Sequence, residues 1–131
     1  MRSPSWEIDG WELEDGEDRH RAAPATFEIP DLAVRQALYP GCFAKLIFRI
    51  ALEGDGDPEA CERMWVIVRE LLPDGSYIGM LDNQPSEIAE NDSLWLGSEL
   101  PFEPRHVIDV GHANDESMAA IAAPPAIPWS R

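Results

Sequence analysis

The chain has 131 residues, 44% of them hydrophobic, which suits one domain with a single buried core. Its 25 acidic and 10 basic residues give a formal net charge of −15, and a surface of that sign repels nucleic-acid phosphates and anionic lipid head groups. Nucleic acids and membranes are therefore disfavoured as partners. A basic protein partner is favoured, although such a charge also serves solubility alone.

The sequence predicts a cytoplasmic protein. No apolar run approaches the ~20 residues of a membrane span, and no apolar stretch follows Arg2 as a signal peptide would require. Both cysteines, Cys42 and Cys61, are expected to be thiols in a reducing compartment. Cys42 lies in an apolar run and is expected in the core.

Residues 1–23 form an acidic N-terminal extension that contains Trp6 and Trp11. A disordered tail rarely carries two tryptophans. One of them is therefore expected to dock on the body of the protein, for example within an edge strand.

The predicted domain covers residues 24–110 and begins with a short helix. Asp31 can cap a helix over 32–38, and Pro40-Gly41 follows directly, as proline and glycine often do past a helix end. So short a helix needs tertiary cover for its apolar side chains.

Three strands are predicted next, at 42–50, 64–71 and 76–81. The first is apolar except at Lys45 and Arg49, and the second is rich in β-branched and aromatic residues. Pro73-Asp74-Gly75 is typical of a tight turn, because proline presets its φ and glycine can take positive φ. The second and third strands are therefore expected to form a hairpin.

The polar stretch 82–93 could form a single helical turn at 85–89, since proline is favoured at a first helical position. Two closing strands are predicted at 99–102 and 106–110, and Pro101 places the first at a sheet edge. Residues 111–131 are predicted to be a tail rich in proline and alanine, ordered only if Trp129 packs back.

These elements predict a mainly β fold of the β-rich α+β class. Five short strands within about seventy residues suggest a small, strongly bent antiparallel sheet, or a partly open barrel resembling SH3 or OB domains. One or two short helices complete the prediction. The strand order is not readable from the sequence.

No catalytic or metal-binding constellation is visible, and no cofactor is expected. The spacing of His106 and His112 is not that of a metal pair. The loop from Asp55 resembles a calcium-binding loop, but the sixth and twelfth positions of that template are Ala60 and Val66 here. A solvated acidic turn is the preferred interpretation.

Four segments resemble a family of small bacterial domains. They are MWVIV at 64–68, GSYIGMLDNQP at 75–85, Leu-Gly at 96–97 and HVIDV at 106–110. Together they are similar to domain of unknown function 2314, although Val110 stands where the family has tryptophan. The resemblance covers 64–110 and implies a β-rich module. It carries over no activity and no functional residue. Immunity proteins beside bacterial toxins offer a looser, class-level analogy.

Three functions follow as hypotheses. The first is a non-enzymatic binding or regulatory module, such as an immunity-type inhibitor of a basic partner. The second is an enzyme of unknown reaction that uses carboxylates and His106 in a cleft. The third is an accessory domain that works only in an oligomer, through an apolar patch at Trp95 or Trp129. The first is preferred, and its expected protein-binding residues are Asp55, Asp57, Glu59, Glu87, Glu90, Asp92 and Trp95.

Overall fold

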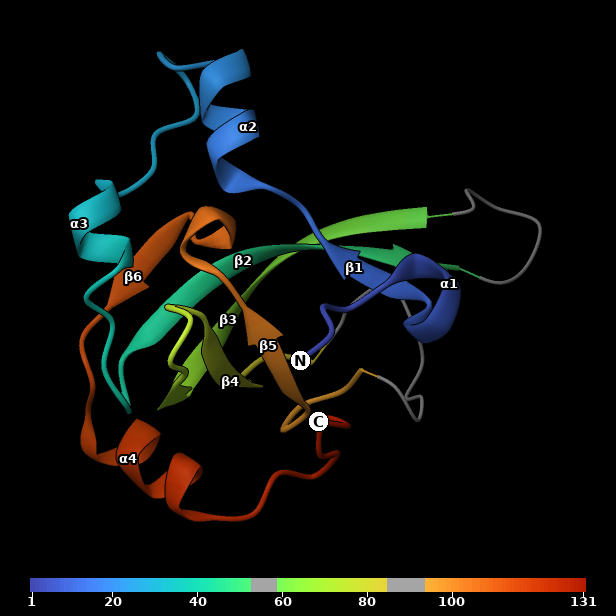
Figure 1. The fold of residues 1–131 in the computed structure, drawn as a ribbon, viewed down its shortest axis with the longest axis vertical. Coiled ribbons are helices and arrows are strands. Elements are labelled where there is room, and N and C mark those ends of the chain that lie inside the picture. Colours follow the sequence, from blue (N-terminus) through green and yellow to red (C-terminus); the bar gives the residue numbers. More distant parts are fainter. Residues whose placement is uncertain (53–58, 85–93) are drawn as a thin grey trace.

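The computed structural model describes residues 1–52, 59–84 and 94–131 and confirms the mainly β fold (Figure 1). A strongly curled antiparallel sheet forms half a barrel, and short helices surround it. The strands are β1 (Trp11–Leu13), β2 (Phe43–Ala51), β3 (Glu59–Leu71), β4 (Tyr77–Leu81), β5 (Glu99–Phe102) and β6 (Asp109–Gly111). The helices are α1 (Trp6–Asp9), α2 (Gly16–Ala22), α3 (Leu32–Arg35), α4 (Asp115–Ala122) and the 3₁₀ helix η1 (Pro104–His106).

The strands follow the order β1-β2-β3-β4-β5, and every neighbouring pair is antiparallel. β3 pairs with the whole of β2, so the other edge of β2 is shared by two short strands. β1 pairs with its end at Phe48–Ile50, and β6 pairs with its beginning at Phe43–Lys45. The two strands on this edge thus come from opposite ends of the chain.

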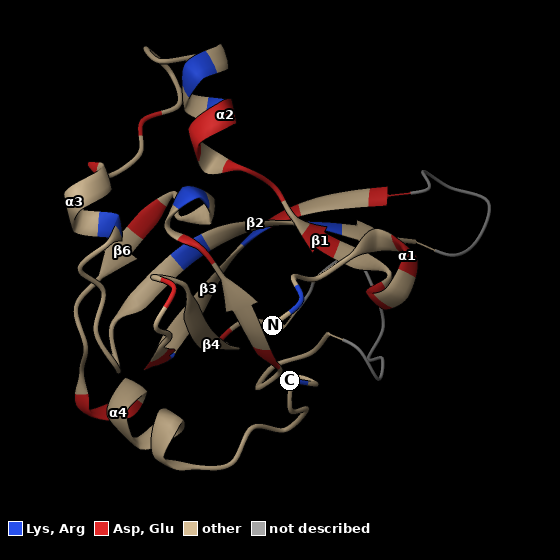
Figure 2. Cartoon of the chain, viewed as in Figure 1, with Lys and Arg blue, Asp and Glu red and all other residues tan. Residues whose placement is uncertain are grey.

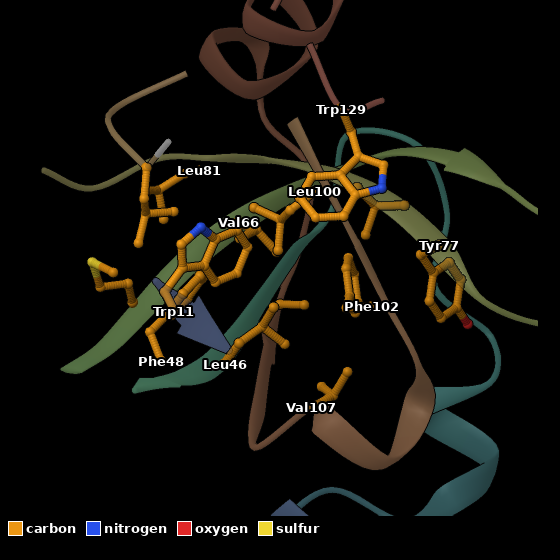
Figure 3. Packing of buried hydrophobic residues seen from close by; sticks show 14 of the residues in the cluster. Trp11, Leu46, Phe48, Val66, Tyr77, Leu81, Leu100, Phe102, Val107 and Trp129 are labelled. Atoms are coloured by element: carbon orange, nitrogen blue, oxygen red, sulfur yellow. The ribbon is translucent and has the colours of Figure 1, made fainter. Parts of the chain in front are cut away.

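The core lies on the inner face of the curled sheet (Figure 3). Alternate residues of β2 and β3, such as Leu46, Phe48 and Val66, point into it, as the period of two of a β-strand requires. Trp11 of β1 and Trp129 near the C-terminus meet within this core, with their ring centroids 6.1 Å apart. Side chains from the two ends of the chain therefore close the half-barrel.

A bulge in β3 supports the curl of the sheet. The register between β3 and β4 shifts between Val68 and Glu70, so Arg69 is the extra residue. Such a bulge increases local twist and bends the strand. It also lets the Arg69 side chain reach Glu99 on β5, with 3.2 Å between the charged atoms.

The hairpin predicted between the second and third strands is present. Gly75 has φ +90°, and the Asp74 carboxylate accepts a hydrogen bond from the Ser76 backbone N–H. β3 begins at Glu59, five residues before the predicted start, because its first residues pair with β2 as far as Ala51. β5 is the last strand in the order, as Pro101 predicted.

The predicted helix over 32–38 is too long. α3 ends at Arg35, and Asp31 makes no capping hydrogen bond. Leu32 and Val34 are exposed, while Arg35 is buried. The apolar pattern of 32–38 suggested a longer helix, but the residue buried from this helix is Arg35, which pairs with Glu17 of α2.

The strand predicted at 106–110 is also wrong in its first half. Pro104 begins η1, and the chain becomes a strand only at Asp109. The expected tail contains α4, whose Asn114 cap accepts a hydrogen bond from the Ser117 N–H. The helical turn predicted at 85–89 lies outside the described residues.

Candidate protein-binding surface

The structure describes two of the seven predicted binding residues, Glu59 and Trp95. The other five lie outside the described residues, namely Asp55, Asp57, Glu87, Glu90 and Asp92. The surface is therefore built here from the carboxylates and aromatic residues that the structure places.

Glu59 is exposed, but it is not a free carboxylate. It begins β3 and accepts a hydrogen bond from Arg49 of β2 at 2.8 Å. Arg49 also binds Glu12 of β1 at 2.7 Å, and its guanidinium lies over the Trp6 ring, 4.9 Å from the centroid. Glu59 thus helps to fasten the N-terminal segment to the sheet.

Trp95 is half-buried and lies beside β5. Its backbone N–H donates to the Ser98 hydroxyl at 2.8 Å, which fixes the turn before the strand. The Leu96 side chain next to it is exposed. Trp129, by contrast, is 9% exposed, so it packs in the core and contributes little to an outer apolar patch.

The arginines are neutralised within the molecule. Eight of the nine pair with carboxylates of the described residues: Arg2 with Asp9, Arg19 with Glu14, Arg21 with Asp18, Arg35 with Glu17, Arg49 with Glu12 and Glu59, Arg69 with Glu99, Arg105 with Asp15 and Glu103, and Arg131 with Glu70 and Glu99. Arg63 and Lys45 lie over the rings of Phe27 and Trp65.

A second set of carboxylates is exposed and has no ion-pair partner within the described part of the chain. Its members are Glu7, Glu28, Asp31, Asp74, Asp82, Asp109, Asp115 and Glu116. We call them the free carboxylates. Figure 2 shows acidic positions on α1, α4, β6 and the connecting segments. The negative field therefore covers several sides of the molecule.

The pKa values of two free carboxylates are shifted in opposite directions. The pKa of Asp82 is raised, first by partial burial and then by the charge of Glu116 on α4. The pKa of Asp74 is lowered, chiefly by the Ser76 hydroxyl that donates to it. The charges of Asp82, which follows β4, and Glu116 of α4 thus repel one another.

His106, the residue of the enzyme hypothesis, has a structural role. Its Nδ1 accepts a hydrogen bond from the Glu103 backbone N–H at 2.9 Å, across η1. Burial, and then the charge of Arg105, lower the pKa of the imidazole to about 4. The ring is therefore neutral near pH 7, and its Nδ1 lone pair is already used.

The stability of the fold should depend on pH through this histidine. Its pKa in the folded chain, about 4, is below the ordinary value of 6.5, so the unfolded chain binds the proton first. Stability should fall as pH drops from about 6.5 towards 4, by about 2 kcal/mol at pH 5 and about 3 kcal/mol in full. Urea unfolding of the wild type and of His106→Asn at pH 7 and pH 5 measures this.

Asparagine keeps an acceptor near the Nδ1 position but does not titrate. The variant should therefore lose about 2 kcal/mol less than the wild type between the two pH values. The exposed His112, replaced in the same way, is the matched control. Equal pH dependence in the wild type and His106→Asn would contradict the role given to His106.

Two hollows lie side by side at the surface near the β3–β4 turn. One of about 340 Å³ is lined by Gln36 and Pro104, and one of about 190 Å³ by Met1 and Arg2. They share Asp74, Ser76 and Glu103 in their walls, and His106 lines neither.

Within residues 1–52, 59–84 and 94–131, no three His, Cys, Asp or Glu side chains are grouped so that they could hold a metal ion. Cys42 is buried and Cys61 is exposed, and both are free thiols. Burial raises the pKa of each thiol, so neither has the lowered pKa of an activated nucleophile. No helix in the described part has the length and apolar character needed to cross a membrane.

Comparison with protein-family models, with curated proteins and with solved structures gives no match. The resemblance of 64–110 to domain of unknown function 2314 therefore stays a prediction. The residues that sequence reasoning missed are Arg35, Glu70, Glu99 and Arg131, whose roles depend on contacts between distant segments. The sequence indicated none of these ion pairs, and for this end of the chain it suggested only that Trp129 could pack against the core.

Proposed function

We propose that the chain is a non-enzymatic binding module that docks on a basic protein through its acidic surface. One observation carries the proposal: eight of the nine arginines are engaged in internal ion pairs, while eight exposed carboxylates have no such partner in the described residues. The field of these carboxylates is not cancelled locally. Such a field speeds encounter with a protein of opposite charge.

The specific form of this function is an immunity-type inhibitor. An acidic module can cover the basic surface with which a partner enzyme binds its own anionic substrate. The partner would then be blocked by charge complementarity alone, without any reaction. His106 is committed to the Glu103 amide, which favours this function over an enzyme that uses His106.

Capture of a partner at two salt concentrations tests the proposal. The full chain is immobilised and exposed to lysate of its host cells at about 0.05 M and about 0.5 M salt, between which the Debye length falls to roughly a third. We expect one basic protein to bind at low salt and to be released at high salt. Capture that is insensitive to salt, or of no basic protein, would overturn the proposal.

Two triple variants locate the contact. The first, Asp82→Asn/Asp115→Asn/Glu116→Gln, removes three free carboxylates around β4 and α4. The matched control, Glu7→Gln/Glu28→Gln/Asp31→Asn, removes three others from the N-terminal third of the chain. A variant within the contact should weaken binding by about 10-fold or more, and one outside it by a few-fold. Unchanged affinity in both would count against an electrostatic interface.

A further inference from the structure

The C-terminal residues 124–131 form a strap that lies along the free edge of β5. Ile127 pairs with Ser98 in a parallel bridge. The Ala126 N–H donates to the Gly97 carbonyl at 3.0 Å, and the Glu99 N–H donates to the Ile127 carbonyl at 2.8 Å. Gly97 has φ +88°, and a Cβ at this position would lie 3.0 Å from the Ala126 Cβ. The turn before β5 is thus shaped to let the strap approach closely.

Trp129 of the strap fills the mouth of the half-barrel. Its ring packs against Trp11, which is 2% exposed, in a T-shaped pair, and the Arg2 guanidinium lies over the Trp129 ring, 4.4 Å from its centroid. The indole N–H groups of Trp11 and Trp129 are both buried, and neither finds a hydrogen-bond partner among the described residues. A buried donor without a partner weakens the contact that buries it.

The strap lies on a surface formed by Gly97, Ser98, Trp11 and two carboxylates, Glu70 and Glu99, and we call this surface the seat. Glu99, 6% exposed, accepts the Trp129 backbone N–H at 3.1 Å and lies 3.5 Å from the Arg131 guanidinium. Glu70 of β3 accepts two further hydrogen bonds from Arg131. The seat therefore holds a tryptophan followed two residues later by an arginine, and the backbone just before them is bonded to Glu99 of β5 through the Ile127 carbonyl.

The seat would keep its form without the strap. Glu99 retains its ion pair with Arg69, and β5 retains its pairing with β4. Trp11 retains its contact with Phe48, at 5.7 Å between ring centroids. An empty seat would present the N–H of Glu99 and the carbonyl of Gly97 at a strand edge, which is how sheet edges bind extended peptides.

The strap is held by few backbone hydrogen bonds. Pro124, Pro125 and Pro128 have no N–H to donate, and α4 ends before the strap begins. Two donors from this backbone are satisfied by the seat, those of Ala126 and Trp129. Release of the strap would therefore break few backbone hydrogen bonds and would leave every strand of the sheet paired.

We propose that the strap is an exchangeable internal ligand, and that its seat binds an extended segment of the basic partner. That segment carries an aromatic side chain for the Trp129 position and an arginine two residues later for Glu70 and Glu99. The inference rests on the proposed function, and it identifies the site at which the chain binds the basic partner. The strap occupies the site until the partner displaces it.

A synthetic octapeptide with the sequence of residues 124–131, PPAIPWSR, is the probe. Its affinity is measured by fluorescence anisotropy for the full chain and for two full-length variants, Trp129→Ala and Trp6→Ala. Trp129→Ala weakens the internal ligand, so the peptide should bind it at least 10-fold more tightly than the wild type. Trp6→Ala removes a tryptophan outside the seat and should bind as the wild type does. A peptide with alanine in place of tryptophan should lose most of its affinity.

Equal affinity for Trp129→Ala and Trp6→Ala would overturn the inference.

Hydrogen exchange in the wild-type chain gives a second test that needs no variant to fold. The amides of Ala126 and Trp129 should exchange at least 100-fold faster than those of β3 and β4, because release of the strap leaves the sheet intact. Exchange of all these amides at one common rate would mean that the strap opens only when the whole chain unfolds, which also overturns the inference.

The two proposals fail separately. If a basic protein is captured in a salt-sensitive manner but the peptide does not bind Trp129→Ala, the proposed function stands and the strap is merely structural. If the peptide binds as expected but no basic protein is captured, the seat is a peptide site and the basic partner is wrong.

Discussion

Replacement of Trp11 with alanine is expected to lower the free energy of unfolding by about 3–5 kcal/mol, the usual cost of deleting a large buried aromatic side chain. Trp11 is 2% exposed and contacts Phe48 and Trp129 within the core. Its loss leaves a cavity at the point where the two ends of the chain close the half-barrel. Urea unfolding, followed by circular dichroism, measures the change.

Two further variants sharpen this test. Trp11→Phe keeps a ring in place and removes the buried N–H donor that has no partner in the described part of the chain, so its cost should be well below that of Trp11→Ala. Trp6→Ala, which removes a half-buried ring stacked on Arg49, should cost about 1 kcal/mol. A cost for Trp11→Ala no larger than that for Trp6→Ala would contradict the closure described here.

Replacement of Arg35 with alanine is expected to cost about 3 kcal/mol, because it breaks an ion pair whose arginine is buried and whose Glu17 is half-buried, and leaves two carbonyls without their donor. Arg35 is 5% exposed. Its guanidinium donates to Glu17 at 2.7 Å, to the Pro30 carbonyl at 2.8 Å and to the Pro104 carbonyl at 3.0 Å. One side chain therefore joins α2, α3 and η1. The same urea unfolding measurement applies.

Arg21→Ala is the matched control for this variant. Arg21 pairs with Asp18 one helical turn away, and both side chains are exposed, so its loss should cost less than about 0.5 kcal/mol. Similar costs for the two variants would show that burial does not distinguish the Arg35 network from a surface pair.

Local sequence signals were sufficient for the strands β2 to β5 and for the hairpin between β3 and β4. The apolar and β-branched run of 42–50 became β2, Pro73-Asp74-Gly75 became the turn, and Pro101 marked an edge strand. Each of these features depends on neighbours within a few residues, which is the range that periodicity and turn chemistry describe.

One error arose where a distant contact overrides local preference. The apolar residues of 32–38 predicted a longer helix, but Arg35 is buried in an ion pair with Glu17, 18 residues away, while Leu32 is exposed. Such a contact cannot be read from spacing along the chain. The other error was local. The apolar run after His106 predicted a strand, but Pro104 begins η1 and the Glu103 N–H donates to His106 three residues later.

The negative charge of the candidate surface was predictable from the sequence, but the carboxylates that form it were not. Net charge indicated an acidic face, yet the sequence could not say which carboxylates the arginines neutralise. Glu59 was predicted as a contact residue and is bound to Arg49, while Asp82 and Glu116 were not singled out. Five of the predicted contact residues lie outside the described ranges and stay predictions.

The shared edge of β2 has a consequence for biosynthesis. The meander from β2 to β5 is built from segments close in sequence, whereas β1 needs β2, and Trp11 needs a residue 118 positions later, for its cover. A ribosome releases the chain from its N-terminus, so the first tryptophans emerge long before Trp129 exists. Until residue 129 has been made, the nascent chain must therefore carry an aromatic surface at Trp11 that Trp129 does not yet cover, and this interval is when a chaperone would be needed most.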